Sequence, residues 1–232
     1  MSRATPQTLT PVSPLASLRR AGTGPVSDAL DRLGRNGGLA GLVRMSGHGV
    51  VAGPAFTLRF DLVRPGEPAP AAEFVDDVPK GAVVVIATGG CTTCTVWGDI
   101  LAYVACRRGI AGTVIDGYCR DIDDIRALDY PLWSLGAYMK SGKGRVRLTA
   151  TGQPVTLGGT TVHPGDLVCA DGAGVVVVPA GQAEEVGRWV AQIEKMEQAI
   201  RADLDTGSSL RDARRRHGYG SAALRTDGRR PA

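Results

Sequence analysis

The chain has 232 residues, of which 43% are hydrophobic and 22% charged, a composition typical of one globular domain and unlike that of a disordered protein. No run approaches the roughly 18 uninterrupted apolar residues of a membrane helix. The first 20 residues also lack the apolar core of a secretory signal. The sequence therefore predicts a cytoplasmic protein that does not associate with membranes.

The formal net charge of +4 is concentrated near the C-terminal end, where residues 211–232 carry seven arginines and two aspartates. The rest of the chain is close to neutral and shows no basic segment suited to nucleic acid. A basic tail can bind nucleic acid or an acidic partner, but it is more often a solvated chain end. We expect a basic tail over residues 208–232 and no nucleic-acid partner.

The N-terminal part begins with a proline-containing segment, residues 1–20, that predicts a flexible arm. A helix is expected over residues 25–33, with Ser27 as its N-cap and an apolar stripe formed by Val26, Leu30 and Leu33. A strand over residues 50–60 follows, and a turn-rich connection comes after it.

Two uninterrupted apolar runs, residues 82–88 and 112–117, predict strands that are buried on both faces. A helix is expected after each strand, over residues 97–108 and 121–128. The first helix has a predicted apolar stripe and a glycine stop, formed by Ile100, Leu101, Val104 and Ala105 and by Gly109.

Residues 131–179 change to short strands broken by glycine and proline, which predicts a compact β layer. A long helix over residues 183–204 ends the domain, which we place at residues 21–207. Alternation of strands and helices followed by a β-rich part predicts a single α/β domain.

Five cysteines are present, and Cys91 and Cys94 form a CxxC motif. Such a motif can be a redox pair or half of a zinc site. The sequence has no second CxxC, and its three histidines are scattered singly. We therefore expect small thiols packed near a site, with neither zinc nor a thioredoxin-type role.

The first candidate site is the start of the helix that follows the first buried strand, at Gly98, Asp99, Ile100 and Leu101. Backbone N–H groups in a first helical turn have no intrahelical acceptor and can bind an anion. Asp99 also suits the positive end of the helix dipole. Alternatively, Gly98 and Asp99 only cap the helix.

The second candidate site, Arg120 and Asp121, follows the second buried strand. Ligands of α/β folds bind beyond the carboxyl ends of strands. Arginine suits bidentate capture of a carboxylate, and aspartate is a hard oxygen ligand for Mg²⁺ or Mn²⁺. The alternative is a surface ion pair with an N-cap aspartate, but two such junctions together favour a functional site. Asp116 and Asp166 are expected to serve turns, and Trp97 and Trp133 to lie in a core or interface.

The segment VWGDILAYVACRRGIAGTVIDGYCRD resembles the family that contains 4-hydroxy-4-methyl-2-oxoglutarate aldolase and the regulator of ribonuclease activity A. Its spacing from Asp99 to Arg120 matches the family pattern. The resemblance continues through VPKGAVVVI, LGGTTVHPGDLVCAD and GVVVVP, and so covers most of residues 25–207.

The resemblance implies a mixed β/β/α sandwich similar to the swivelling phosphohistidine domain, assembled as a homotrimer or hexamer with active sites between subunits. Arg120 would grip the substrate, and Gly98 to Leu101 would form its cradle. Asp121 would bind Mg²⁺ or Mn²⁺ directly, and Asp99 would hold metal-bound water. Glu197 of a neighbouring subunit, or failing it Glu194, would supply a further acid through water.

The function that the resemblance implies is a metal-dependent lyase for a small 2-oxo acid, acting by retro-aldol cleavage to pyruvate, by decarboxylation of oxaloacetate, or by both. The four lysines lie outside both motifs, which disfavours a Schiff-base aldolase. The loop at residues 89–94 and the Asp171-Gly172-Ala173-Gly174 segment depart from the commoner aldolase pattern. A non-enzymatic regulator of a ribonuclease and a lyase recruited to a specialised pathway remain the alternatives.

Overall fold

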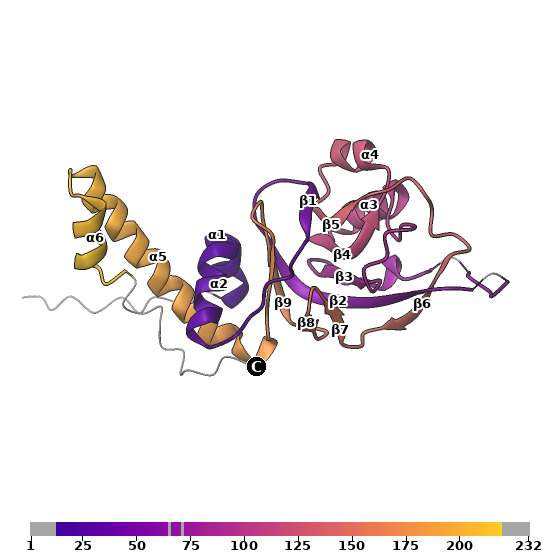
Figure 1. Cartoon of the computed structure of the whole chain (residues 1–232), viewed down its shortest axis with the longest axis horizontal. Helices are drawn as coiled ribbons and strands as arrows, with labels where there is room; N and C mark the ends of the chain where they lie inside the picture. Colours follow the sequence, from indigo (N-terminus) through magenta and orange to yellow (C-terminus); the bar gives the residue numbers. More distant parts are fainter. Residues whose placement is uncertain (1–12, 65, 71, 220–232) are drawn as a thin grey trace, which may run out of the picture.

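The computed structural model describes residues 13–64, 66–70 and 72–219. One curled mixed sheet has the strand order β1-β5-β4-β3-β2-β9-β10, with β6 paired to β2, while β7 and β8 form a separate hairpin (Figure 1). The strands are β1 (Val43–Ser46), β2 (Val51–Leu62), β3 (Val83–Ala87), β4 (Gly112–Cys119), β5 (Leu132–Ala137), β6 (Val146–Thr151), β7 (Val155–Leu157), β8 (Thr160–Val162), β9 (Leu167–Ala170) and β10 (Val175–Val178).

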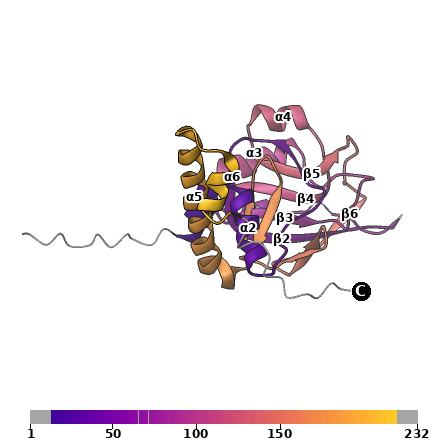
Figure 2. The ribbon, with the colours of Figure 1, turned by 60° about the vertical axis from the view of Figure 1, so that its left-hand side comes forward.

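The helices lie in two groups against different parts of this sheet (Figures 1 and 2). They are α1 (Pro14–Ala21), α2 (Thr23–Arg32), α3 (Asp99–Arg108), α4 (Ile122–Ala127), α5 (Ala183–Asp205) and α6 (Leu210–Arg216), with 3₁₀ turns at Val75–Asp77 and Ala180–Gln182. No helix among the described residues is both long and apolar enough to cross a membrane. The predicted single α/β domain is confirmed, while its likeness to the swivelling phosphohistidine domain stays a prediction.

The parallel strands β3, β4 and β5 form the centre of the molecule. All five residues of β3 are buried, and their side chains alternate between two cores. Val84 and Ile86 pack in the cluster that includes residues of α3 and α4. Val83 and Val85 pack in the cluster with β7, β8 and β9. The uninterrupted apolar runs therefore form strands buried on both faces, as predicted.

The short strands of residues 131–179 do not form the compact layer that their pattern predicts. β5 extends the parallel sheet, while β6 and β9 pair with β2. Two local hairpins are present, one of β7 with β8 and one of β9 with β10. The pattern indicates strands, but β5, β6 and one edge of β9 take partners from earlier parts of the chain, which local composition cannot show.

The N-terminal residues also differ from the prediction, because α1 occupies part of the expected arm, whose residues 1–12 lie outside the described residues. Leu18 is fully buried between α1 and the core. The next helix begins at Thr23, and Ser27 is not its N-cap. The Asp171 carboxylate accepts hydrogen bonds from the backbone and hydroxyl of Thr23, so a residue 148 positions away supplies the capping interaction.

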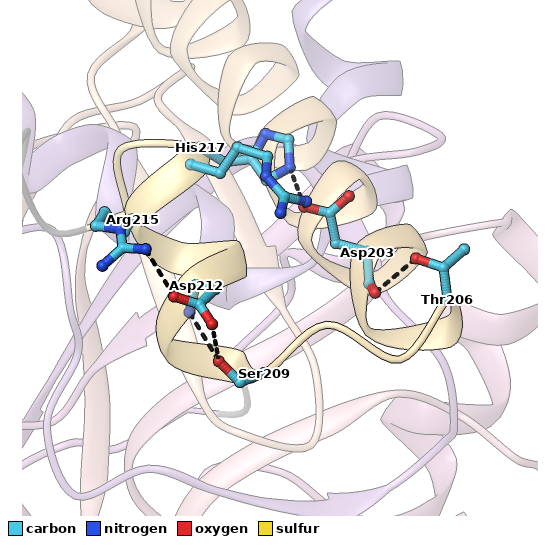
Figure 3. A network of polar contacts seen from close by, with 7 residues as sticks. Asp203, Thr206, Ser209, Asp212, Arg215 and His217 are labelled. Atoms are coloured by element: carbon cyan, nitrogen blue, oxygen red, sulfur yellow. Dashed lines mark hydrogen bonds and ion pairs between the residues drawn. The ribbon is translucent and has the colours of Figure 1, made fainter.

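The C-terminal helices form a hairpin that projects from the sheet (Figure 1). Helix α5 packs on α1 and α2, and its buried residues are Val186, Val190, Ile193 and Ile200. Helix α6 lies inside the segment predicted as a basic tail. Figure 3 shows how it is fixed: Ser209 caps it, while His217 and Arg216 contact Asp203 of α5.

Candidate active site

Helix α3 begins at the edge of the sheet where β3 and β4 have their carboxyl ends. Gly98 is the N-cap in an extended conformation and, as a glycine, provides no side chain to cap the helix. The Asp99 amide donates a hydrogen bond to Asp121 Oδ2 at 3.3 Å. The amides of Ile100 and Leu101, also in the first turn, have no intrahelical acceptor and so can bind an anion.

The stripe predicted for α3 is only partly correct. The residues of this helix that are buried against the sheet are Ala102 and Ala105, whereas Ile100 is 71% exposed. The helix is rotated relative to the prediction because small side chains let it pack closely on the sheet. The rotation turns Ile100 and Leu101 toward a pocket.

Asp121 has the left-handed conformation, with φ of 56° and ψ of 41°. It occupies the N-cap position of α4, yet its carboxylate makes no capping hydrogen bond there. Instead Oδ2 lies 3.1 Å from Arg120 Nε and accepts the bond from Asp99. A non-glycine residue in this conformation is uncommon and is often found where function requires it.

Gly98 is required by the close approach of these groups. A Cβ at this position would lie 2.6 Å from Asp121 Oδ2 and 3.2 Å from Arg120 Nε. The backbone N–H of Arg120 also donates to the carbonyl of Trp97 at 3.1 Å. The two predicted junctions are therefore in direct contact, as expected for neighbouring parallel strands.

A pocket of about 350 Å³ opens at this junction. Of the predicted substrate-binding residues, Gly98, Asp99, Ile100, Leu101 and Arg120 all line it. The rest of its wall is formed by Phe60, Pro70, Ala72, Phe74, Thr95, Val96, Trp97, Ser141, Gly142, Lys143 and Val146. The pocket thus has a polar end, at the α3 amides and the Arg120 guanidinium, and an apolar wall from β2 and the 3₁₀ turn.

Lys143 is a pocket residue that the sequence analysis missed. It lies in the glycine-containing connection between β5 and β6, outside both motifs. Gly142 allows this connection to approach Thr95, since a Cβ there would lie 2.3 Å from the Thr95 carbonyl oxygen. The polar, glycine-flanked segment was the only signal available. All four lysines lie outside the two motifs in sequence, but the fold brings Lys143 to the pocket.

Glu197 and Glu194 lie elsewhere, on α5. This helix packs against α1 and α2, whereas α3 and α4 pack in a separate core (Figure 1). Glu197 pairs with Arg201 at 3.3 Å, and Glu194 pairs with Arg20 at 2.7 Å. Neither glutamate reaches the pocket of its own chain, so a role at the site requires a second subunit.

The fold gives structural roles to the four residues for which the sequence predicts them: Asp116, Asp166, Trp97 and Trp133. Asp116 is buried and accepts hydrogen bonds from the backbone of the loop after β3; burial raises its pKa against the lowering effect of these bonds with Thr88, Gly90 and Gly89. Asp166 accepts from the amides of His163 and Ala180. Trp133 is fully buried, and Trp97 is buried while also lining the pocket.

The described residues contain no group of three or more histidine, cysteine, aspartate or glutamate side chains placed to hold a metal. Two hard oxygen donors are near the pocket: Asp99 lines it, and Asp121 contacts the lining residues Arg120 and Asp99 without lining it itself. Mg²⁺ is often bound through one or two carboxylates, with water and substrate oxygens completing its shell. The donors therefore fit such an ion only if substrate, water or another subunit completes the set.

Comparison with known proteins agrees with this geometry. A solved structure of an uncharacterized protein from Pseudomonas syringae superimposes with a TM-score of 0.80 and 39% identity, covering 89% of this chain and all of that one. Streptomyces coelicolor RraAS2, described as an unusual member of the RNase ES inhibitor RraA protein family, has a TM-score of 0.74 and 31% identity over 87% of this chain and 98% of its own.

Protein DlpA of Legionella pneumophila is 38% identical over 88% of this chain, which spans only 34% of that protein. A protein of Halalkalibacterium halodurans named "Putative 4-hydroxy-4-methyl-2-oxoglutarate aldolase" is 33% identical over 74% of this chain and 79% of its own. The family model RraA-like (Aldolase/RraA) matches residues 23–177, which contain the whole pocket. The chain belongs to the RraA-like family.

Proposed function

We propose that the protein is a divalent-metal-dependent lyase for a small 2-oxo acid. It cleaves a substrate of the 4-hydroxy-4-methyl-2-oxoglutarate type to give pyruvate, decarboxylates oxaloacetate, or does both. The observation that carries the proposal is the contact of Arg120 and Asp121 with the start of α3 at one pocket. The name given to the relative from Halalkalibacterium halodurans supports the same reaction class.

The substrate is held at the polar end of the pocket. The Arg120 guanidinium suits bidentate binding of a carboxylate, and the first-turn amides of α3 donate to oxygens that gain negative charge as the bond breaks. The volume of about 350 Å³ suits a small acid. The apolar wall, which includes Phe60 and Phe74, limits the water that can reach the reacting carbon.

Mg²⁺ or Mn²⁺ is the cofactor that the donors fit best. The Asp121 carboxylate makes no capping bond and would ligate the ion directly, while Asp99 would act through water. When bound, such an ion would supply a Lewis acid for the 2-oxo group and its developing negative charge. Asp99, or Glu197 of a neighbouring subunit, would orient a water molecule that moves the proton.

A homotrimer or hexamer would complete the site with Glu197 from a neighbouring subunit. Mixing an Arg120→Ala chain with a Glu197→Ala chain tests this arrangement. If sites are shared, exchange between two inactive parents restores part of the activity. No recovery, despite demonstrated exchange of subunits, would contradict a shared site.

Because Lys143 lines the pocket, a Schiff-base aldolase is a competing mechanism. An amine at the pocket can attack a 2-oxo group. On the metal-dependent mechanism, a Lys143→Met variant keeps turnover, and borohydride in the presence of pyruvate traps no adduct on the wild type. A trapped adduct at Lys143 together with loss of turnover in the variant would replace the metal mechanism.

The second candidate function is a protein regulator of a ribonuclease. Its support is the 31% identity with RraAS2, which belongs to a family described by ribonuclease inhibition. Pyruvate release from a panel of 2-oxo acids, with and without Mg²⁺ or Mn²⁺ after chelation, separates the two. Metal-dependent release supports the lyase, and no release from any substrate favours the regulator.

A further inference from the structure

Cys91 and Cys94 lie in the loop that connects β3 to the pocket, and their Sγ atoms are 3.8 Å apart. Both side chains are buried, with 9% of Cys91 and 2% of Cys94 exposed. All five cysteines of the chain are free thiols in the structure. The proposed lyase function assigns no role to this CxxC pair.

The two thiols are held in different environments. Burial alone would raise the pKa of Cys91, but hydrogen bonds from the side chain and backbone of Thr93 and from Cys94 outweigh it and lower that pKa. Burial, together with the neighbouring Cys91, raises the pKa of Cys94 to about 11. Cys91 thus resembles the attacking thiol of a reactive CxxC pair, and Cys94 resembles the second thiol, which stays protonated.

The loop is anchored on both sides of the pair. The Cys91 amide donates to Thr88 Oγ1 at 3.0 Å, and that hydroxyl donates to the Asp116 carbonyl at 2.9 Å. On the other side, the Thr95 amide and hydroxyl both donate to the Lys140 carbonyl. Ahead of the pair, Gly89 and Gly90 have φ of 66° and 76°, which only glycine adopts easily.

We propose that Cys91 and Cys94 form a reversible disulfide by exchange with a small-molecule disulfide, and that this loop is therefore a modification site. The two sulfurs, 3.8 Å apart, need to approach by about 1.8 Å to reach the roughly 2.05 Å of an S–S bond. The residues that directly follow Cys94 line the pocket: Thr95, Val96, Trp97 and Gly98. The disulfide would therefore tie Cys91 to the start of the segment that forms the cradle.

The reaction balances with a small disulfide as the oxidant. The Cys91 thiolate attacks one sulfur, forms a mixed disulfide and releases one small thiol. Cys94 then loses its proton and attacks Cys91 Sγ, which forms the intrachain bond and releases the second small thiol. The two protein thiols are oxidised, the small disulfide is reduced, and the two protons end on the released thiols.

The test uses the whole 232-residue chain and glutathione disulfide. After incubation, free thiols are blocked with a maleimide under denaturing conditions, and the protein is cleaved at lysine, at arginine and before aspartate. Cleavage after Lys80 and before Asp99 separates the pair from Cys106. We expect the peptide of residues 81–98 to carry an internal disulfide that dithiothreitol reverses. Wild-type protein that keeps all five thiols would overturn the proposal.

The variants assign the order of attack. Cys94→Ser should stop at a mixed disulfide of glutathione on Cys91, whereas Cys91→Ser should form no adduct at this loop. Cys106→Ser, which alters an exposed cysteine of α3, should still lose two thiols. Loss of two thiols in Cys91→Ser as well would show that another pair reacts. The experiment measures the oxidation state of the thiols, so its result does not depend on whether the protein is a lyase.

Discussion

Two helix starts in this protein use polar side chains in opposite ways. At α6, Ser209 accepts a hydrogen bond from the Asp212 amide at 3.1 Å, and Asp212 pairs with Arg215 (Figure 3). At α4, Asp121 holds the same cap position but leaves the helix uncapped and faces α3. The Asp121 carboxylate instead contacts the first amide of α3 and Arg120, so it joins the two junctions beside the pocket.

The same contrast holds for the ion pairs of the two regions. Asp203 contacts His217 and Arg216, so the α5–α6 end of the molecule has its charges satisfied locally. Arg120 and Asp121 contact each other through one nitrogen and one oxygen, beside a pocket and a helix N-terminus. Their remaining donors and acceptors are those that a ligand would use. Substitutions should therefore affect activity at one region and stability at the other.

The largest expected effect is that of Asp121→Ala. Pyruvate release should fall by roughly 10²–10³-fold or more, as when a charge-stabilising group is removed, while thermal unfolding stays near that of the wild type. Asp123→Asn, which alters a fully exposed carboxylate on the same helix, is the matched control and should keep its rate. Wild-type turnover in Asp121→Ala would remove the metal assignment.

Arg120→Lys should be almost as severe. An ammonium group keeps the charge but cannot bind a carboxylate through two parallel hydrogen bonds. We expect kcat/KM to fall by about 10²-fold, measured with the best 2-oxo acid of the panel. An unchanged kcat/KM would show that Arg120 does not grip the substrate.

Gly98→Ala tests whether contact between the two junctions matters. The added Cβ would meet Asp121 Oδ2 at 2.6 Å, so the carboxylate and Arg120 must shift. Misplacement of this kind can cost up to about 10²-fold in rate. Gly24→Ala is the control, because nothing lies within 4 Å of its Cβ and α2 should tolerate alanine. Equal activity in both variants would mean that the contact is not needed.

Asp171→Ala should affect stability rather than chemistry. Burial alone would raise the pKa of Asp171, but hydrogen bonds from Thr23 and Ala173 and the charge of Arg44 outweigh it and lower that pKa. Because the folded pKa is lowered, the stabilisation is present above about pH 4 and is lost as the pH falls through the folded value. The variant should lose about 1–3 kcal/mol at neutral pH and show a weaker acid dependence.

Denaturant unfolding at neutral and acid pH measures this effect. Asp31→Ala, on an exposed position of α2, is the control and should change stability little. An Asp171→Ala variant with the acid dependence of the wild type would contradict the assigned role.

The candidate site could be predicted because its parts are local. Each half directly follows a buried parallel strand, and adjacent parallel strands bring their carboxyl ends together. The spacing from Asp99 to Asp121 was therefore enough to expect contact between Arg120, Asp121 and the start of α3.

Features that depend on distant contacts could not be predicted. Asp171 provides the polar partner at the start of α2 from 148 residues away, and Lys143 reaches the pocket only through the β5–β6 connection. The orientation of α3 follows from close packing of Ala102 and Ala105 on the sheet. The residue types alone predict instead that Ile100 is buried. In each case the deciding contact joins segments that no local pattern relates.

The most direct test of the central claim is Mn²⁺ binding, followed by the electron paramagnetic resonance signal of the free ion. Titration is carried out with the wild type, Asp121→Asn and Asp123→Asn, each with and without pyruvate. We predict that the wild type and Asp123→Asn reduce the free-ion signal, more strongly with pyruvate present, and that Asp121→Asn does not. Binding by Asp121→Asn equal to that of the wild type would contradict the account.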